Sequence, residues 1–190
     1  MNKILIVSGH TDLSHSFANK IILEKLAQDL PDAVFDYLDK AYPDFSIDVK
    51  AEQEKLVAAD VIVLQFPVFW YSYPSIMHRW MEDVFAHGFS HGSTGKALHG
   101  KKLIASFTTG APEEMYVKNG PQLFPIEELI IPAFKCIANL CGMEFAGYVY
   151  SGGLSYASRP SGETLKAMQD KAAAHAERLE KVLIKGDYTL

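Results

Sequence analysis

Hydrophobic and polar positions follow two alternating periods along this chain. Short apolar runs rich in β-branched residues indicate buried parallel strands, and stretches with apolar residues at three- and four-residue steps indicate helices. Five runs predict strands, at residues 3–8, 34–38, 61–66, 103–107 and 144–150. Because strands and helices alternate throughout, the pattern predicts an α/β fold, a doubly wound five-stranded parallel sheet with helices on both faces.

Five helices are expected between and after these strands. One begins at Ser16 and ends before Pro31, a second follows Asp48 and ends near Ala59, a third begins near Ser75, a fourth runs from Ile126 to Leu140 with a bend or late start at Pro132, and the last follows Ser161. Asp48 and Ser161 are the predicted N-caps, because a short side-chain oxygen can bind a free amide at a helix start. Glu52 and Glu54 would complement the dipole of the second helix.

An aromatic loop follows the third predicted strand. The strand ends at Pro67, which has no N–H for a sheet ladder, and the loop then contains Phe69, Trp70 and Tyr71. Ligands of open parallel sheets bind outside the carboxyl ends of the strands, so these rings could form a platform for a flat ligand. The alternative is that these side chains and Phe66 are core aromatics. Their position between two prolines makes a binding surface at least as well supported.

The loop after the first predicted strand offers groups that suit an anion. Residues 9–19 contain His10 and Ser16 and lead into a helix, whose free amides and dipole favour a phosphate. The loop lacks both the Gly-x-Gly-x-x-Gly fingerprint and the Gly-Lys-Ser/Thr phosphate loop, so nucleoside triphosphate chemistry is disfavoured.

A third loop, residues 108–116, follows the fourth predicted strand. It begins with the small residues Thr108, Thr109, Gly110 and Ala111, which allow backbone amides to come close to a ligand. The three loops together indicate a planar ring that carries carbonyl groups and a phosphate tail. Flavin mononucleotide (FMN) fits that description.

Composition limits the remaining classes of function. With 190 residues and 48% hydrophobic content, the chain is expected to form one domain over residues 1–190. A formal net charge of −5 gives no basic field for nucleic acid. No apolar run reaches the length of a membrane span, and Met1 leads directly into a strand pattern, so a cytoplasmic location is expected.

The cysteines and a histidine-rich loop are the candidates for a metal or redox site. Cys136 and Cys141 lie five residues apart in one predicted helix and turn to different faces, which favours buried free thiols. His87, His91 and His99 lie among glycines in a long loop. Since no further ligands stand at metal-like spacing, we predict solvated histidines and no metal site.

Three motifs carry a resemblance to a known family. Residues 65–72 read Gln-Phe-Pro-Val-Phe-Trp-Tyr-Ser, residues 80–85 read Trp-Met-Glu-Asp-Val-Phe, and residues 108–110 read Thr-Thr-Gly. With these motifs the chain resembles the NAD(P)H:quinone oxidoreductase family of flavodoxin-like flavoproteins. The resemblance covers at least residues 3–116.

Four further motifs are similar to those of one group within that family. They are Ser-Phe-Ala-Asn at 16–19, Tyr-Pro-Asp-Phe at 42–45, Ala-Glu-Gln-Glu at 51–54 and Ala-Leu-His-Gly-Lys at 97–101. The group comprises bacterial quinone reductases that are ancillary subunits of glutathione-gated potassium efflux systems. The resemblance therefore implies a possible antiporter partner at the membrane.

The resemblance also implies a cofactor and the residues that bind it. FMN is favoured over FAD, because the similar group binds FMN, and NAD(P)H and a quinone are the implied substrates. The implied cofactor-binding residues are His10, Ser16, Phe17, Ala18 and Asn19 for the phosphate, Pro67, Val68, Phe69, Trp70 and Tyr71 for the ring, and Thr108, Thr109, Gly110 and Ala111 for the ring edge.

The chain departs from the family pattern at two positions. The family usually has a second glycine where Ala111 stands, and its Tyr–His proton relay matches Tyr116 but meets Gln122 in place of the histidine. Glutamine cannot carry a proton as imidazole does. Tyr116 is the predicted catalytic residue, since a phenol with a pKa of about 10 can donate a hydrogen bond near neutrality.

The resemblance implies a homodimer with the site at the interface, to which Phe124, Phe134, Tyr148 and Tyr150 could contribute apolar contacts. Two other classes of function stay open. A flavodoxin-type electron carrier would bind flavin without oxidising NADPH with a quinone. A regulatory subunit of an antiporter would do so and would also co-purify with a membrane partner.

Overall fold

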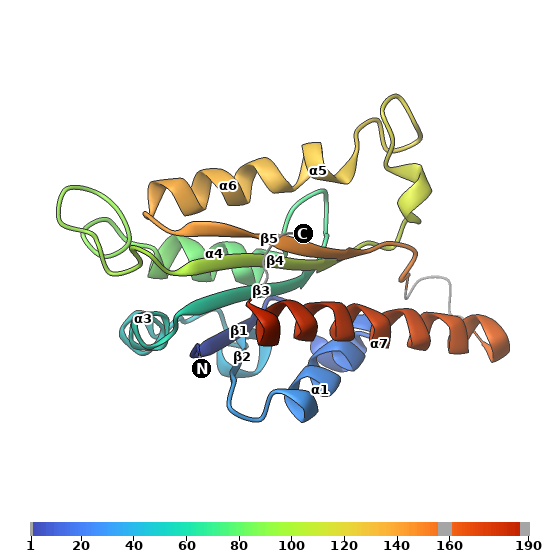
Figure 1. Ribbon diagram of the computed structural model, residues 1–190, viewed down its shortest axis with the longest axis horizontal. Helices are drawn as coiled ribbons and strands as arrows, with labels where there is room; N and C mark the ends of the chain where they lie inside the picture. The colour runs from blue at the N-terminus through green and yellow to red at the C-terminus, as the bar shows by residue number, and fades with distance from the viewer. Residues whose placement is uncertain (1, 156–160, 187–190) are drawn as a thin grey trace.

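A five-stranded parallel sheet with helices on both faces forms the centre of the computed structural model, which describes residues 2–155 and 161–186 (Figure 1). The strands are β1 (Ile4–Ser8), β2 (Val34–Tyr37), β3 (Val61–Pro67), β4 (Lys102–Thr108) and β5 (Glu144–Ser151). Their order in the sheet is β2-β1-β3-β4-β5. This order confirms the predicted flavodoxin-like architecture, and it places the topological switch point between β1 and β3.

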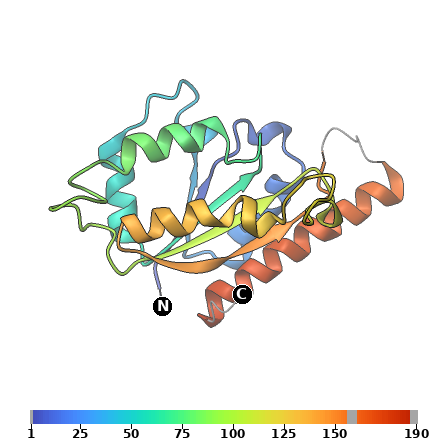
Figure 2. The ribbon, with the colours of Figure 1, turned by 90° about the horizontal axis from the view of Figure 1, so that it is seen from above.

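The helices form one layer on each face of the sheet. They are α1 (Ala18–Asp29), α2 (Leu38–Ala41), α3 (Val49–Ala58), α4 (Ser75–Val84), α5 (Ile126–Leu129), α6 (Ile131–Leu140) and α7 (Gly162–Lys185), with two 3₁₀ turns, η1 (Leu13–His15) and η2 (Glu113–Met115). The helices α1 and α7 pack together on one face, whereas α4, α5 and α6 cover the other (Figures 1 and 2). None of the helices in the described ranges is long and apolar enough to cross a membrane.

Several predicted boundaries shift, each for a local reason. The second strand ends at Tyr37, because the buried Leu38 begins α2. The helix predicted at Ser16 begins at Ala18, after the 3₁₀ turn η1. The strand predicted to end before Pro67 includes it, since the next amide, that of Val68, donates to the Thr108 carbonyl at 2.8 Å and continues the ladder.

The predicted helix over residues 126–140 is interrupted at Ile130, between α5 and α6. Pro132 lies in the first turn of α6, where its missing N–H costs no helical hydrogen bond. This is the late start that the proline predicted.

Both residues predicted as N-caps occupy that position, and one of them makes the predicted side-chain hydrogen bond. The Asp48 carboxylate accepts from the Ala51 amide at 3.1 Å. Ser161 occupies the N-cap position of α7 as predicted, but its side chain makes no capping hydrogen bond. Its backbone carbonyl, which accepts from the Leu165 amide at 3.4 Å, is the group that contributes to the first turn.

Aromatic side chains fill the core under α4 and α6. The Phe66 ring stacks on Phe107 and Phe134 at centroid distances of 5.6 Å in each case, and all three rings are fully buried. The core alternative is therefore correct for Phe66. Phe134 cannot contribute to a subunit contact, because the fold of one chain already covers it. Cys141 is buried as predicted, whereas Cys136 is exposed, because α6 turns it to the solvent.

A buried carboxylate joins α3 to α4 and β2. Glu52 was expected to complement a helix dipole, but it is 0% exposed and accepts hydrogen bonds from the Tyr42 hydroxyl at 2.6 Å and the Trp80 indole at 2.8 Å. The Lys55 ammonium lies 2.5 Å from Glu52 and 2.9 Å from Asp36. Two carboxyl groups therefore share one lysine in the core.

Burial and hydrogen bonding determine which of the two carboxyl groups in this cluster holds a proton. Burial and the neighbouring Glu52 raise the pKa of Asp36 from 3.8 to about 7. Although burial opposes its ionisation, hydrogen bonds hold the pKa of Glu52 below its ordinary value. The buried Oδ2 of Asp36 has no hydrogen-bond partner in the described part of the chain, which fits a proton held on that carboxyl group.

Replacing Asp36 with asparagine should therefore remove a pH dependence of stability. In the wild type, the proton on Asp36 contributes to the free energy of unfolding in full below about pH 4. This contribution is lost as the pH rises through about 7, because the folded state must then release the proton. The variant cannot ionise, so its free energy of unfolding relative to the wild type should rise by about 4 kcal/mol between pH 4 and pH 8, the equivalent of about three pKa units. Urea unfolding at several pH values measures this difference. A difference that is constant with pH would contradict the assignment of the proton to Asp36.

Candidate functional site

A cavity of about 420 Å³ opens at the carboxyl edge of the sheet, where the loops after β1, β3 and β4 meet. Its volume lies in the range of about 300–1,000 Å³ that is typical of small-molecule sites. The cavity is lined by His10, His15, Ser16, Phe17, Ala18, Asn19, Pro67, Val68, Phe69, Thr108, Gly110, Leu154 and Ser155. Ten of these residues are on the predicted list, which shows that the three loops converge as expected.

The N-terminus of α1 faces this cavity without a side-chain cap. The N-cap residue is Phe17, whose side chain makes no capping hydrogen bond, and the first helical backbone bond runs from the Ile21 amide to the Phe17 carbonyl. The amides of the first turn precede that bond and have no partner within the helix. Ser16 and Ala18 from the same segment line the cavity. A phosphate would satisfy these amides and complement the helix dipole.

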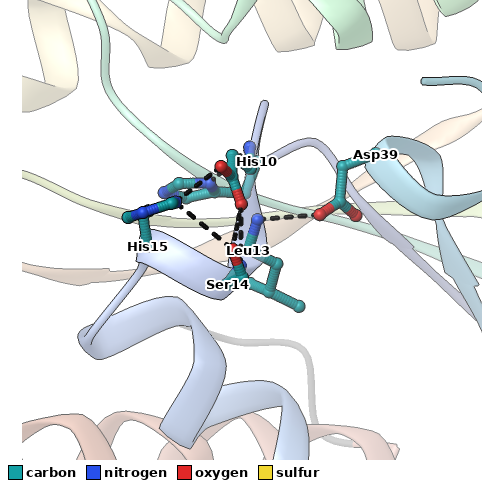
Figure 3. Close-up of polar contacts among 6 residues, drawn as sticks. His10, Leu13, Ser14, His15 and Asp39 are labelled. Carbon is teal, nitrogen blue, oxygen red and sulfur yellow. Dashed lines mark hydrogen bonds and ion pairs between the residues drawn. The ribbon is translucent and has the colours of Figure 1, made fainter.

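The loop between β1 and α1 is held by the Asp12 carboxylate, whose partners Ser14 and His15 are labelled in Figure 3. Asp12 accepts from the Ser14 amide at 3.0 Å and the Ser14 hydroxyl at 2.6 Å, and it lies 2.6 Å from His15 Nδ1. These hydrogen bonds lower the pKa of Asp12 to about 2. The Leu13 amide donates to Asp39 at 2.7 Å, which ties the loop to α2.

His10 is oriented by the same loop. The Asp12 amide donates to His10 Nδ1 at 3.0 Å, and burial lowers the pKa of His10. A neutral imidazole that accepts at Nδ1 carries its proton on Nε2, so the other ring nitrogen is a donor. His10 also meets the Phe69 ring edge to face at 5.8 Å, which links the first loop to the aromatic loop.

The aromatic loop forms a tight turn that presents its rings to solvent. Phe69 and Ser72 exchange backbone hydrogen bonds of 2.9 and 3.1 Å, and the two residues between them, Trp70 and Tyr71, have φ values of 50° and 61°. Left-handed backbone at residues other than glycine costs about 1–3 kcal/mol each. Trp70 is 95% exposed. Tyr71 and Phe69 are 53% and 41% exposed, so the core alternative is wrong for all three rings.

A second cavity, of about 300 Å³, adjoins the first and shares Val68 and Gly110 with it. It is lined by Val68, Trp70, Tyr71, Gly110, Ala111, Tyr116 and Gln122. The Tyr71 hydroxyl donates to the Gln122 side-chain oxygen at 3.1 Å and so joins the aromatic loop to the loop after β4. Burial raises the pKa of Tyr116, which keeps its phenol protonated near neutral pH.

The loop after β4 is fixed by hydrogen bonds that do not use its cavity side. The Thr109 hydroxyl donates to the Ala111 carbonyl at 2.8 Å and lies 2.9 Å from the Tyr150 hydroxyl. Thr109 itself lines neither cavity, unlike the other predicted residues of this loop. The nearest atom to a methyl group at Gly110 would be Ser155 Cβ, at 3.5 Å, an ordinary contact. The protein therefore does not require glycine at this position, whereas a ligand that approaches the backbone closely would.

Sequence reasoning missed three residues of the first cavity. His15 belongs to the polar loop that was singled out, but no spacing distinguished it from its neighbours. Leu154 and Ser155 come from the segment after β5 and carried no motif. In the described ranges the structure brings together no group of three or more His, Cys, Asp or Glu side chains that could hold a metal ion.

These features fit a flavin with a phosphate tail. The uncapped helix end supplies amide donors, the neutral His10 supplies a further donor, and the bare backbone at Gly110 leaves room for a ring edge. Another cavity of about 390 Å³ lies between the ends of α1 and α7 at the opposite edge, where the described parallel strands have their amino ends. It is therefore not the candidate site.

Comparisons with known proteins agree with this fold. Residues 2–178 match the family described as flavodoxin-like fold. An NAD(P)H oxidoreductase of Bacillus subtilis, YrkL, described as uncharacterized, is 40% identical over 143 residues, which are 75% of this chain and 81% of the relative. The crystal structure of general stress protein 14 from Treponema denticola in complex with FMN has 26% identity and a TM-score of 0.84, covering 95% of this chain and 99% of that one.

A third solved structure shares the fold at lower identity. An NADPH-quinone reductase from P. pentosaceus is 23% identical with a TM-score of 0.73, over 93% of this chain and 98% of the other. Because the family match covers most of the sequence, this chain belongs to the flavodoxin-like fold family.

Proposed function

We propose that this chain is one flavin-binding domain that acts as an FMN-dependent NAD(P)H oxidoreductase, with a quinone or a similar small molecule as electron acceptor. The observation that carries the proposal is the pair of adjoining cavities that share Val68 and Gly110. One has an uncapped helix end, and the other has aromatic walls and a phenol. Two adjoining compartments suit a reaction in which a bound cofactor and a flat substrate must meet.

The residues around the first cavity would hold the cofactor. His10, Ser16 and the amides at the start of α1 would bind the phosphate, and Val68 and Phe69 would border the ring. The backbone at Gly110 would donate to the ring edge and stabilise negative charge there. Bound FMN would supply the redox chemistry, accepting a hydride from NAD(P)H and passing two electrons to the quinone. The FMN complex of the Treponema protein and the oxidoreductase name of the Bacillus relative support this assignment.

The Tyr116 hydroxyl would be a hydrogen-bond donor in the second cavity. It is 9% exposed, and its raised pKa keeps the phenol protonated. Replacing Tyr116 with phenylalanine should lower kcat for quinone reduction about tenfold and change the dissociation constant of FMN less than about twofold, because one hydrogen bond to a substrate is lost. Steady-state kinetics with NADPH and a soluble benzoquinone measure this effect.

Tyr148 provides a matched control. Its hydroxyl donates to Glu127 at 2.9 Å, and it lines neither of the two adjoining cavities. The Tyr148→Phe variant should keep wild-type kinetics. Equal turnover in the Tyr116 variant and the wild type would remove the catalytic role of Tyr116.

The proposal includes a cytoplasmic homodimer. Apolar side chains are exposed beside the second cavity, with Trp70 at 95%, Leu123 at 64% and Phe124 at 50%. A second copy that covers these side chains would bury apolar surface and close the mouth of the cavity. This rim supports a dimer whose interface includes the site.

The experiment that tests the function is an anaerobic titration of FMN-reconstituted protein with NADPH, followed by addition of a quinone. We expect the flavin absorbance to bleach and then to recover. Flavin that binds but stays oxidised would contradict the enzyme and favour an electron carrier. Co-purification of the active enzyme with a membrane antiporter would add the regulatory role that the sequence resemblance implies.

A further inference from the structure

A row of hydrogen-bonded polar side chains, called here the hydrogen-bond chain, runs from the surface of α7 through the buried face of the sheet to the first cavity. Six of its seven members are almost fully buried. At the surface end, Arg178 Nη2 donates to Ser151 Oγ (2.8 Å), and Ser151 Oγ lies 2.9 Å from His175 Nδ1. In the middle, His175 Nε2 lies 2.8 Å from Ser106 Oγ, and Ser106 donates to Gln65 Oε1 (2.6 Å). At the cavity end, Gln65 Nε2 donates to Asn19 Oδ1 (2.8 Å), and Asn19 Nδ2 donates to Thr108 Oγ1 (3.1 Å).

Arg178, at the surface end, determines the direction in which the members of the hydrogen-bond chain donate to one another. Arg178 has only donors, so Ser151 must accept from it. The Ser151 hydroxyl can then give its hydrogen to His175 Nδ1, and His175 donates from Nε2 to Ser106. In the opposite direction Ser151 would accept from both neighbours, and its fully buried hydrogen would lose the His175 acceptor. A buried polar group left unpaired costs about 1–3 kcal/mol, so one direction is strongly favoured.

His175 is suited to carry this direction because it stays neutral. Burial, with the nearby Arg178 charge as a second cause, lowers the pKa of His175 to about 3. A neutral imidazole donates from one nitrogen and accepts at the other, so the tautomer of His175 depends on the direction of donation along the hydrogen-bond chain.

The direction determines what Thr108 presents to the cavity. Because the Thr108 hydroxyl accepts from Asn19, its own hydrogen remains for an acceptor in the cavity that Thr108 lines. If donation along the hydrogen-bond chain were reversed, Thr108 would donate to Asn19 and offer only lone pairs to a ligand.

We propose that Arg178 and His175 are positioning residues, which act through Ser106, Gln65 and Asn19 to make the Thr108 hydroxyl a hydrogen-bond donor to the ligand. The inference rests on the proposed function, since FMN is the ligand whose acceptor atoms the donor would meet. It assigns a role in cofactor affinity to an exposed arginine that lies six hydrogen bonds from Thr108.

The test uses the exposed end of the chain, where a substitution leaves the core unchanged. Arg178→Met should weaken FMN binding about fivefold, as expected for one hydrogen bond that is no longer oriented. Arg178→Lys keeps a donor and should restore affinity to within about twofold of wild type. Arg79→Met makes the same chemical change at an exposed arginine paired with Asp83 and should have no effect. Ser106→Ala, which interrupts the chain in the core, should match Arg178→Met.

Two readouts separate this proposal from the proposed function. Fluorescence titration measures the dissociation constant of FMN, and ¹⁵N NMR of the ligand-free protein identifies the His175 tautomer. We expect the Nε2–H tautomer in the wild type and a mixture in Arg178→Met. Wild-type protein that fails to bind FMN would overturn the function and this proposal with it. Wild-type protein that binds FMN, together with unchanged affinity in Arg178→Met or an Nδ1–H tautomer, would overturn this proposal alone.

Discussion

Replacing Ser16 with aspartate is expected to weaken FMN binding about 100-fold while the fold remains intact. Ser16 lines the first cavity just before the uncapped N-terminus of α1. The substitution removes a hydroxyl that can bind a phosphate and adds a carboxylate that repels it, which together cost about 3 kcal/mol. A negative charge near a helix N-terminus stabilises the helix itself. Affinity and stability should therefore respond differently to the same substitution.

Fluorescence titration with FMN and urea unfolding of the ligand-free variant measure the two effects. Ser16→Ala separates loss of the hydroxyl from the added charge and should weaken binding less than the aspartate does. Ser75→Asp adds the same charge at the start of α4, whose N-cap is also without a side-chain hydrogen bond, and should leave FMN affinity within about twofold. Wild-type affinity in Ser16→Asp would exclude the end of α1 as the phosphate site.

Replacing Glu52 with alanine should lower the free energy of unfolding by about 3–5 kcal/mol, the usual cost of removing one member of a buried charge cluster. The substitution leaves the Tyr42 hydroxyl and the Trp80 indole N–H without their acceptor, and Lys55 loses the ionised one of its two carboxyl partners. It also leaves a cavity between α3 and α4. Chemical denaturation measures the loss.

Glu54 offers the matched control for that experiment. It lies in the same helix, two residues further on, and its side chain is exposed. Glu54→Ala should change the free energy of unfolding by less than about 0.5 kcal/mol. Equal stability of the two variants would mean that the Glu52 cluster contributes nothing beyond its neighbours.

The two largest predictions concern different parts of the molecule. Ser16 lines the cavity at the carboxyl edge of the sheet, whereas the side chains around Glu52 line neither of the two adjoining cavities there. An effect of Glu52→Ala on FMN affinity, measured under conditions where the variant is folded, is therefore not expected. This separation allows stability and binding to be tested independently.

The sequence by itself determined the sheet, the order of strands and helices, and the three loops that meet at the site. These features depend on residues that are close in the chain. Apolar periodicity distinguishes strand from helix within a few residues, and prolines mark the ends. Since the carboxyl ends of parallel strands share one edge, loop positions alone placed His10, Phe69 and Gly110 around one cavity.

Only the tertiary structure decided which polar residues are partners inside the fold. Glu52 was expected to complement a helix dipole, His175 carried no signal within a long amphipathic helix, and Cys136 was expected to be buried. The chain from Arg178 to Thr108 joins side chains separated by up to 89 residues in sequence. Such partners are chosen by how helices pack on the sheet, and because that packing brings together distant segments, no local pattern of residues records it.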